Sequence, residues 1–375
     1  MAQSAVRLGV IGTGGFARSM HLPRFQQLSG VEVVAVCNRT AATAQQVARE
    51  FGVARAVTDW REVIAMPDVD AVLIATWPYL HAPASIAALE AGKHVLCLGR
   101  MAMNLAEARS MLEAARRAQE RGVRAMLVPP AFAVAGDASM RRLLAEGYVG
   151  RVHQVLAVFL NDQHSHAAAP LTWRQDRELS GINVLLLGAH YEVTRRWLGD
   201  VTGVMAREQT FIRERPAPDG SGRLAPVTVP DAITVVADLA QGGTLTFLES
   251  SVARFAGPPR IEIYGSEGTL VYRIPGDEIL GARAGDKELA PLPIPEDLRR
   301  TWTVEADFLR MVREGGPEVE PTFADGVAYM EFTQAARLSA TVGGWVPLPL
   351  RGDMEIPPTS ERWAELWRGR PGHQP

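Results

Sequence analysis

The chain has 375 residues, 47% of them hydrophobic and 22% charged, and a formal net charge of −3. This length favours two domains, and this composition is typical of a globular protein. The charge balance argues against nucleic acid or an anionic membrane as a partner, and no apolar run is long enough to cross a bilayer. Because the start resembles no signal peptide and the two cysteines suggest no disulfide framework, we expect a cytoplasmic protein.

The first part of the chain alternates short apolar runs with helical patterns. Strands that are apolar on both faces and separated by helices predict an α/β domain with a parallel, doubly wound sheet. We expect it to span residues 1–128, because Pro129-Pro130 then interrupts the pattern. The predicted strands are Val6–Ile11, Val31–Cys37, Ala71–Thr76, His94–Leu98 and Arg124–Val128, and the predicted helices are Phe16–Leu28, Ala41–Phe51, Ala82–Ala91 and Leu105–Gln119.

Residues 129–375 show strands with few helices between them. Turn signals at 241–243 and 265–268 suit antiparallel connections, so we predict an α+β domain with an open, mostly antiparallel sheet. An open sheet has a face to cover, and we expect a homo-oligomer. The predicted strands are Val152–Leu160, Val204–Ile212, Ala232–Leu239, Thr244–Ser251, Arg260–Tyr264 and Thr269–Tyr272. The predicted helices are Ala138–Glu146 and Ile182–Leu198, and two later helices, Val304–Glu314 and Phe323–Thr341, are expected to pack on this sheet. We expect exposed loops at Arg215–Pro230 and Ala282–Pro295. Trp363 and Trp367 are expected to lie on a short docked helix near the end of the chain.

A glycine-rich turn follows the first predicted strand and opens the first helix. Its residues 12–17 fit the pattern G-x-G-x-x-G/A, which in this context indicates a dinucleotide-binding Rossmann domain. Gly12 permits the tight turn, Gly14 lets the backbone approach a pyrophosphate, and Ala17 allows close packing of helix and strand. The pyrophosphate then meets free N–H groups at the helix N-terminus. The alternative is a glycine turn without a ligand. The cofactor candidates here are Gly12, Gly14, Gly15, Phe16, Ala17 and, at the end of the third predicted strand, Thr76.

The end of the second strand bears on the choice of cofactor. A carboxylate there would bind both ribose hydroxyls of NAD and repel a 2′-phosphate. This chain has Asn38, Arg39 and Thr40 instead. Arg39 can pair with a phosphate and Thr40 can donate a hydrogen bond, which favours NADP. The alternative is that Arg39 stacks over adenine and Asn38 binds the hydroxyls of NAD, so NAD stays open.

Several runs of the sequence resemble the Gfo/Idh/MocA oxidoreductase family. They are the glycine turn, the stretch 70–95, Trp173-Arg174 followed by Leu179-Ser180-Gly181, and the helix with Gly188-Ala189-His190 and Trp197-Leu198-Gly199. The resemblance covers nearly the whole chain. It implies a Rossmann domain followed by a sheet domain that carries the substrate site and often forms oligomers. It also implies NAD(P)-linked oxidation or reduction of a small molecule at a carbon of a sugar, inositol or similar polyol.

The chain departs from the family pattern at two places. The family has Glu-Lys-Pro after its own fifth strand, which corresponds to the predicted strand His94–Leu98, and this chain has Leu98-Gly99-Arg100 there. Gly99 therefore stands where the family lysine orients the nicotinamide and helps proton transfer. The family helix reads Asp-x-Gly-x-His-x-x-Asp, and only its Gly and His remain here. His190 and Arg100 are therefore the catalytic candidates, since a histidine suits proton transfer near neutral pH. The alternatives are a structural histidine for His190 and a surface arginine or a phosphate contact for Arg100.

Further candidates follow from family position. Trp173, Arg174, Asp176 and Asn183 are expected at the substrate, although an exposed ion pair on a loop would explain Arg174 and Asp176 as well. His81 is expected near the nicotinamide ribose. Tyr191 and Glu192 flank His190 and are expected to point elsewhere on the helix. His164 and His166 with His190 form too loose a set to predict a metal, because no carboxylate or cysteine accompanies them.

Three functions are consistent with these residues. The first is an NAD(P)-dependent oxidoreductase acting on a sugar, inositol or related polyol or keto compound, which the dinucleotide motif and His190 favour. The second is a non-catalytic dinucleotide-binding regulatory protein, which the loss of the lysine at position 99 favours. The third is a lyase or glycosidase that oxidises its substrate transiently and retains its cofactor, as the family resemblance allows.

Overall fold

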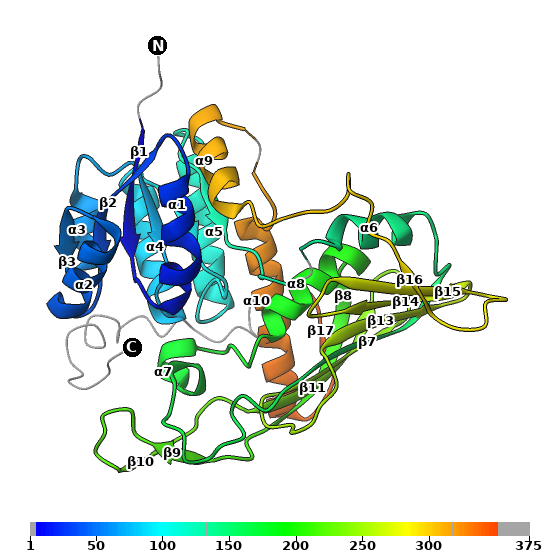
Figure 1. The fold of residues 1–375 in the computed structure, drawn as a ribbon. Coiled ribbons are helices and arrows are strands. Elements are labelled where there is room, and N and C mark those ends of the chain that lie inside the picture. The colour runs from blue at the N-terminus through cyan, green and yellow to red at the C-terminus, as the bar shows by residue number, and fades with distance from the viewer. Residues whose placement is uncertain (1–4, 133, 317, 352–375) are drawn as a thin grey trace.

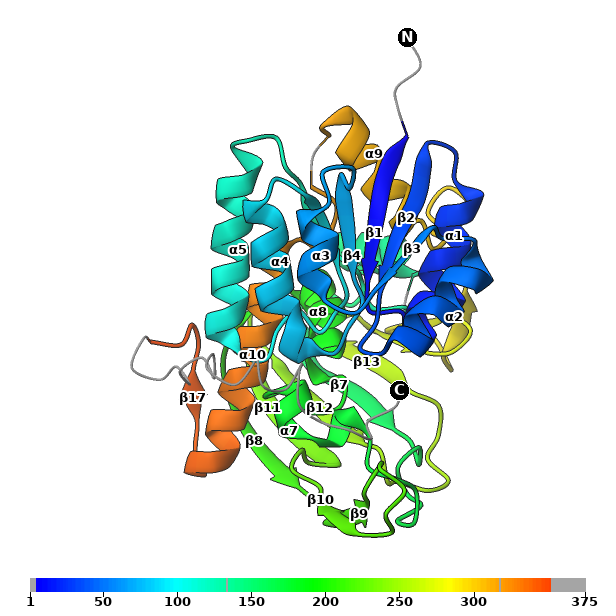
Figure 2. The same ribbon diagram turned by 90° about the vertical axis from the view of Figure 1, so that its left-hand side faces the viewer.

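Two sheets organise the chain, and a computed structural model describes residues 5–132, 134–316 and 318–351 (Figures 1 and 2). The first sheet is wholly parallel, with the strand order β3-β2-β1-β4-β5-β6. The order reverses next to β1, which is the point where such sheets bind ligands. The strands are β1 (Val6–Ile11), β2 (Val31–Cys37), β3 (Arg55–Val57), β4 (Ala71–Ile74), β5 (His94–Cys97) and β6 (Ala125–Leu127).

Helices cover both faces of the parallel sheet and bury its apolar strands. One face packs against α3, α4 and α5, and the other against α1, α2 and, from much later in the chain, α9. Two of these helices begin at a capping side chain: Thr40 accepts a hydrogen bond from the Thr43 amide before α2, and Asn104 accepts one from the Glu107 amide at 2.9 Å before α5. The helices are a π-helix (Ala17–His21) continued by α1 (Leu22–Gln27), α2 (Ala41–Phe51), α3 (Trp60–Ala65), α4 (His81–Glu90) and α5 (Leu105–Gln119).

The second sheet has nine strands in the order β16-β15-β14-β13-β7-β12-β11-β8-β17. Every neighbouring pair is antiparallel except β7 and β12, so the predicted α+β architecture with a mostly antiparallel sheet is confirmed. A separate hairpin of β9 (Glu214–Pro216) and β10 (Leu224–Pro226) stands beside it. The strands of the large sheet are β7 (Val152–Leu160), β8 (Val201–Gln209), β11 (Ala232–Leu239), β12 (Thr244–Ser250), β13 (Arg260–Gly265), β14 (Gly268–Arg273), β15 (Glu278–Arg283), β16 (Ala290–Leu292) and β17 (Val346–Pro347).

One face of the large sheet is covered by helices from its own domain. Helix α10 runs between the two sheets and packs on α5, α8 and β8, which joins the two domains through one core (Figure 1). The opposite face carries exposed apolar side chains, among them Met205 and Val236, which are paired across β8 and β11. Within the described ranges no helix combines the length and apolarity needed to cross a membrane. The helices are α6 (Asp137–Ala145), α7 (Arg177–Ser180), α8 (Leu187–Leu198), α9 (Val304–Glu314) and α10 (Phe323–Val342).

Several expectations for individual elements were wrong. Helix α9 packs on the parallel sheet rather than on the second one, because its apolar side chains Val304, Phe308 and Met311 complete the core beside β1. The short elements β3 and α3 were missed, since three and six residues give little periodicity. The stretch expected as the exposed loop Arg215–Pro230 contains the β9–β10 hairpin, and Arg215 is buried because its guanidinium donates to the backbone carbonyls of His164 and His166. The expected helix with Trp363 and Trp367 lies outside the described residues.

Candidate functional site

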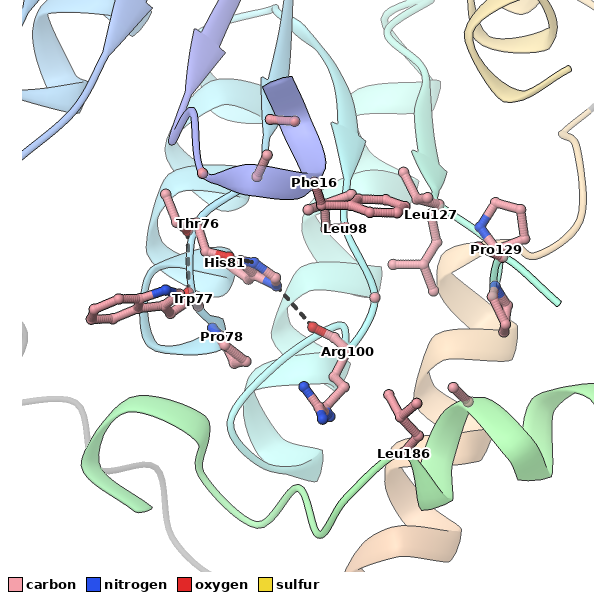
Figure 3. A pocket seen from close by; sticks show the side chains of 18 of the residues that line it. Phe16, Thr76, Trp77, Pro78, His81, Leu98, Arg100, Leu127, Pro129 and Leu186 are labelled. Atoms are coloured by element: carbon pink, nitrogen blue, oxygen red, sulfur yellow. Dashed lines mark hydrogen bonds between the residues drawn. The ribbon is translucent and has the colours of Figure 1, made fainter. Parts of the chain in front are cut away.

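Three adjoining cavities lie where the carboxyl ends of the parallel strands meet the second domain. The edge cavity, about 80 Å³, lies between the glycine turn and the end of β2. The central cavity, about 550 Å³, continues from the glycine turn to the ends of β5 and β6 and the start of α8 (Figure 3). The inner cavity, about 210 Å³, lies deeper, against β7 and β12 of the large sheet. Gly14, Thr76 and Trp77 line both the edge and central cavities, and Arg100, Arg174 and Leu186 line both the central and inner ones.

The glycine turn has the geometry that a dinucleotide pyrophosphate requires. Gly12 has a φ of +86°, and a Cβ there would lie 2.8 Å from the Ala75 backbone, so only glycine fits. A Cβ on Gly14 or Gly15 would meet no atom within 4 Å, and both residues line the central cavity. Open backbone at the start of a helix is what two phosphates need to approach closely. Phe16 and Ala17 also line the central cavity, as expected.

The residues predicted to choose the cofactor line the edge cavity together. The side-chain oxygen of Asn38 accepts a hydrogen bond from the Thr13 amide at 2.9 Å, which ties the end of β2 to the glycine turn. Thr40 caps helix α2, and Arg39 lies over the ring of Trp77 with its guanidinium carbon 4.7 Å from the ring centroid. No carboxylate of the described chain lines this cavity.

Two tryptophan side chains form a wall that runs from the edge cavity toward the second domain. The ring of Trp77 stacks on that of Trp173, with centroids 6.1 Å apart and planes 18° apart. Arg174 lies over the Trp173 ring at 4.3 Å and Arg100 at 5.5 Å. A flat aromatic wall that carries guanidinium groups at both ends therefore flanks the three cavities.

His81 is buried behind the central cavity and holds two parts of its wall (Figure 3). Its Nδ1 lies 2.8 Å from the carbonyl oxygen of Arg100 and its Nε2 lies 3.0 Å from that of Thr76. Burial lowers the pKa of His81, whereas the contacts with backbone carbonyls act in the opposite direction. The side chain therefore fixes the loop after β5 relative to the loop after β4.

The loop after β5 lines the central cavity without a lysine. A Cβ at Gly99 would lie 3.9 Å from the hydroxyl of Tyr329, which accepts a hydrogen bond from the Met101 amide at 2.5 Å. Arg100, 7% exposed, donates through Nε to the Leu185 carbonyl at 2.9 Å. Burial and the neighbouring Arg174 lower the pKa of Arg100 to about 9, which still leaves it a cation at neutral pH.

His190 forms a buried pair with a carboxylate from the large sheet. Its Nδ1 lies 2.7 Å from an oxygen of Glu249 on β12, and its ring stacks on Phe159 with centroids 3.4 Å apart. Both residues of the pair line the inner cavity. A carboxylate bound to one ring nitrogen fixes the orientation of the imidazole and leaves the other nitrogen to exchange a proton with a ligand. This is the arrangement of an acid/base histidine.

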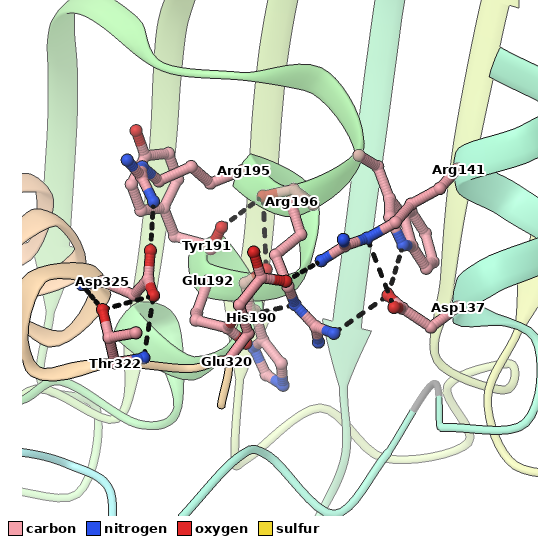
Figure 4. A network of polar contacts seen from close by, with 12 residues as sticks. Asp137, Arg141, His190, Tyr191, Glu192, Arg195, Arg196, Glu320, Thr322 and Asp325 are labelled. Carbon is pink, nitrogen blue, oxygen red and sulfur yellow. Dashed lines mark hydrogen bonds and ion pairs between the residues drawn. The ribbon is translucent and has the colours of Figure 1, made fainter. Parts of the chain in front are cut away.

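Glu192 lies in a network of polar contacts (Figure 4) and lines the central cavity, whereas His190 lines the inner one, so the two side chains point in different directions, as expected. It lies on α8 three residues after Ala189, which also lines that cavity, so one stripe of the helix faces it. One carboxyl oxygen lies 2.7 Å from Nε of Arg196, which in turn contacts Asp137 at 3.0 Å. Burial raises the pKa of Glu192 to about 7. Tyr191 is buried and stacks on Phe332, which agrees with its expected position away from the site.

Two of the predicted substrate residues are not brought to the three cavities. Asn183 was expected on the predicted helix Ile182–Leu198, one turn before Leu186, but α8 starts at Leu187 and Asn183 lies in the preceding loop. There its amide donates to the Ala102 and Ser180 carbonyls at 2.9 and 2.6 Å. Asp176 caps helix α7 by accepting from the Glu178 amide. Both residues shape the loop that carries Trp173 and Arg174 toward the cavities.

The histidines considered for a metal do not converge. His164 and His190 line the inner cavity, whereas His166 is exposed and lines none of the three cavities. In the described ranges, no three or more His, Cys, Asp or Glu side chains are grouped as a metal site.

Glu249 is the site residue that the sequence reasoning missed although a signal existed. Leu245, Phe247 and Glu249 point to the same face of β12, and the first two are core residues. A glutamate on the buried face of a strand needs a partner, so its position marked it as unusual. That the partner is His190, 59 residues away in sequence, depends on the packing of α8 on the sheet.

Comparison with known proteins agrees with this fold and site. Residues 6–125 match a model described as an oxidoreductase family with an NAD-binding Rossmann fold, and residues 138–271 match the GFO/IDH/MocA C-terminal domain. Levoglucosan dehydrogenase of Pseudarthrobacter phenanthrenivorans is 29% identical over 92% of this chain and 98% of its own length. The 1,5-anhydro-D-fructose reductase of Ensifer adhaerens is 31% identical over 71% of this chain and 75% of its own. The structure of levoglucosan dehydrogenase in complex with NADH has a TM-score of 0.78 and 26% identity over 93% of this chain and all of that one.

Fold and glycine turn together define an NAD-binding, two-domain oxidoreductase. The chain belongs to the Gfo/Idh/MocA oxidoreductase family, which confirms the resemblance seen in the sequence.

Proposed function

We propose that the protein moves a hydride between a nicotinamide dinucleotide and a carbon of a sugar, inositol or related polyol or keto compound. One observation carries the proposal: a continuous run of cavities starts at the glycine turn and ends beside the His190–Glu249 pair. The bound nicotinamide supplies the hydride chemistry, and the protein has to orient the reacting carbon and exchange a proton. The relatives named as sugar dehydrogenases and reductases support the same reaction class.

In this proposal the edge and central cavities hold the dinucleotide. The glycine turn holds the pyrophosphate, and the residues at the end of β2 hold the adenine ribose. His81 holds the loops around the nicotinamide ribose through its hydrogen bonds to Thr76 and Arg100. The residues proposed for the cofactor are Gly12, Gly14, Gly15, Phe16, Ala17, Asn38, Arg39, Thr40, Thr76 and His81.

We propose NADP as the preferred cofactor, with NAD as the alternative. The edge cavity has a guanidinium and no carboxylate among its described lining residues, so a 2′-phosphate meets no repulsion there. Asn38 uses its side-chain oxygen on the glycine turn, which leaves its NH₂ group as the one able to face the ribose. The relative solved with NADH supports the alternative.

His190 is the proposed proton acceptor in oxidation and donor in reduction. The inner cavity that it lines is large enough for one small polyol, and Glu249 stabilises the imidazolium that forms when the substrate hydroxyl loses its proton. Arg100 sits at the boundary of the central and inner cavities and is the proposed group that orients the substrate oxygen. Because Gly99 has no side chain, we propose that His190 and Arg100 together orient the substrate and transfer the proton, as the lysine does in the family.

We also propose how the two domains share these tasks. Residues 1–128 bind the dinucleotide, and residues 129–375 bind the substrate and form the oligomer. The exposed pair Met205 and Val236 on the uncovered sheet face supports a homo-oligomer, which light scattering on the purified protein checks. Cys37 and Cys97 are buried and free, which suits a reducing cytoplasm.

Turnover with both cofactors against sugars, inositols and related keto compounds tests the proposal. We expect His190-dependent formation or loss of the reduced cofactor, read by its absorbance. Binding of cofactor without turnover across the panel would favour a regulatory protein instead. Product formation without net change in the cofactor, together with cofactor that co-purifies, would favour a lyase or glycosidase.

A further inference from the structure

Two arginines at the boundary between the central and inner cavities form no ion pair with a carboxylate in the described part of the chain. Arg100 and Arg174 line both cavities and approach the same tryptophan ring, Trp173. Neither guanidinium has a side-chain hydrogen bond to a carboxylate within the described chain. The charge of Arg174 lowers the pKa of Arg100, so the two cations repel each other, and an anion between them would relieve that cost.

The carboxylates that line the inner cavity are already engaged. Asp231 accepts hydrogen bonds from the amides of Phe211 and Ile212 at 2.9–3.0 Å, and Glu249 accepts from His190. The fully buried Arg215 adds a further positive charge beside this cavity. The surroundings of the inner cavity therefore hold three guanidinium groups against two carboxylates, with both carboxylates bound elsewhere.

The structural roles of the two arginines leave donors free. Arg100 uses Nε and Nη2 on the Leu185 carbonyl, which leaves Nη1 and its hydrogens. Arg174 has a stacking contact with Trp173 as its one described contact at the guanidinium. Burial lowers the pKa of both groups, so a neighbouring anion would relieve the cost of keeping them charged.

We propose that the substrate is an acid: a sugar or polyol whose carboxylate binds between Arg100 and Arg174. This inference rests on the proposed function and specifies its substrate class. Planar guanidinium groups suit a carboxylate because they can donate two parallel hydrogen bonds. The boundary between the cavities is also where substrate and nicotinamide meet, so the carboxylate lies near the carbon that is oxidised.

Calorimetric titration of the purified full-length protein, with and without saturating NAD(P)⁺, tests the inference directly. The probes are D-glucuronate and D-gluconate, with D-glucose and D-sorbitol as their neutral counterparts and D-glucose 6-phosphate as a different anion. We expect at least one acid to bind about tenfold or more tightly than its neutral counterpart, as a charge-assisted hydrogen bond provides. Equal binding of acids and neutral sugars, or tighter binding of the phosphate than of both acids, would overturn it.

Variants separate a binding role from a structural one. We expect Arg174→Gln to weaken binding of the acid more than binding of its neutral counterpart, which removes the preference for the acid, and Arg174→Lys to restore part of that preference. Arg151→Gln, an exposed arginine at the start of β7, is the matched control and should change neither. If Arg174→Gln weakens acid and neutral ligands equally, the arginine does not bind a carboxylate. Because the titration does not require turnover, it decides this inference even if the proposed reaction fails.

Discussion

The two ends of the cavity system follow the family pattern to different degrees. At the glycine turn every residue has the type that the pattern demands, and the backbone geometry explains why: Gly12 could not carry a side chain. At the end of β5 and the start of α8 the lysine and both aspartates are replaced, and the site instead holds a histidine–glutamate pair and two arginines that form no ion pair within the described residues. The comparison indicates that the cofactor half is constrained by backbone shape, whereas the substrate half has been rebuilt around other side chains.

The cofactor half gives the largest expected effect. Gly14→Glu would place a carboxylate in open space on the cavity wall where we propose that the pyrophosphate binds, so we expect loss of saturable dinucleotide binding in a fluorescence titration. Because no atom lies near a Cβ at this position, the melting temperature should hardly change. Gly257→Glu adds the same charge on an exposed loop and is the control. Unchanged affinity in Gly14→Glu would mean that the dinucleotide does not approach this turn.

In the substrate half, His190→Asn should lower kcat by about 10²–10⁴, as expected for the loss of a positioned acid/base group. The dissociation constant for the cofactor should stay the same, since His190 lines the inner cavity and is absent from the lining of the other two. Steady-state kinetics on the first substrate found, with His166→Asn as the matched control, provide the measurement. An unchanged kcat in His190→Asn would mean that His190 takes no part in proton transfer.

Cofactor choice should respond to Arg39 by a smaller factor. If Arg39 pairs with a 2′-phosphate, Arg39→Ala should weaken NADPH binding by about tenfold or more, the size of a charge-assisted hydrogen bond, and NADH binding much less. Arg49→Ala, on the exposed side of α2, should affect neither. Equal losses for both cofactors would instead support stacking of Arg39 over adenine.

The raised pKa of Glu192 predicts that the stability of the protein depends weakly on pH. Its pKa is about 7 in the folded protein, above its ordinary value of 4.5, because it is buried. The folded state therefore holds the proton more tightly than the unfolded chain does, and wild-type stability falls as the pH rises from about 5 to 8. In thermal unfolding, the melting temperature of Glu192→Gln should rise relative to that of the wild type by about a few degrees over this pH range. A difference that stays constant with pH, as expected for the exposed Glu288→Gln, would contradict this.

The sequence predicted the cofactor half better than the substrate half for a physical reason. The glycine turn, the end of β2 and Thr76 follow strand ends of one parallel sheet, so their convergence follows from the sheet itself. The substrate half joins residues far apart in the chain, such as His190 and Glu249 or Arg100 and Leu185. The sequence did not show that Glu192 lines a cavity, because α8 presents two neighbouring stripes to two different cavities and the second one is formed by other elements. Helix α9 was assigned to the wrong sheet because an amphipathic pattern does not say which core it completes.

Titration of the purified protein with NADPH and NADH, read by tryptophan fluorescence, tests the central claim most directly. Trp77 lines both the edge and central cavities and Trp173 lines the central one, so a dinucleotide bound there must change their emission. We predict saturable quenching with both cofactors and tighter binding of NADPH. Absence of saturable binding with either would contradict the account.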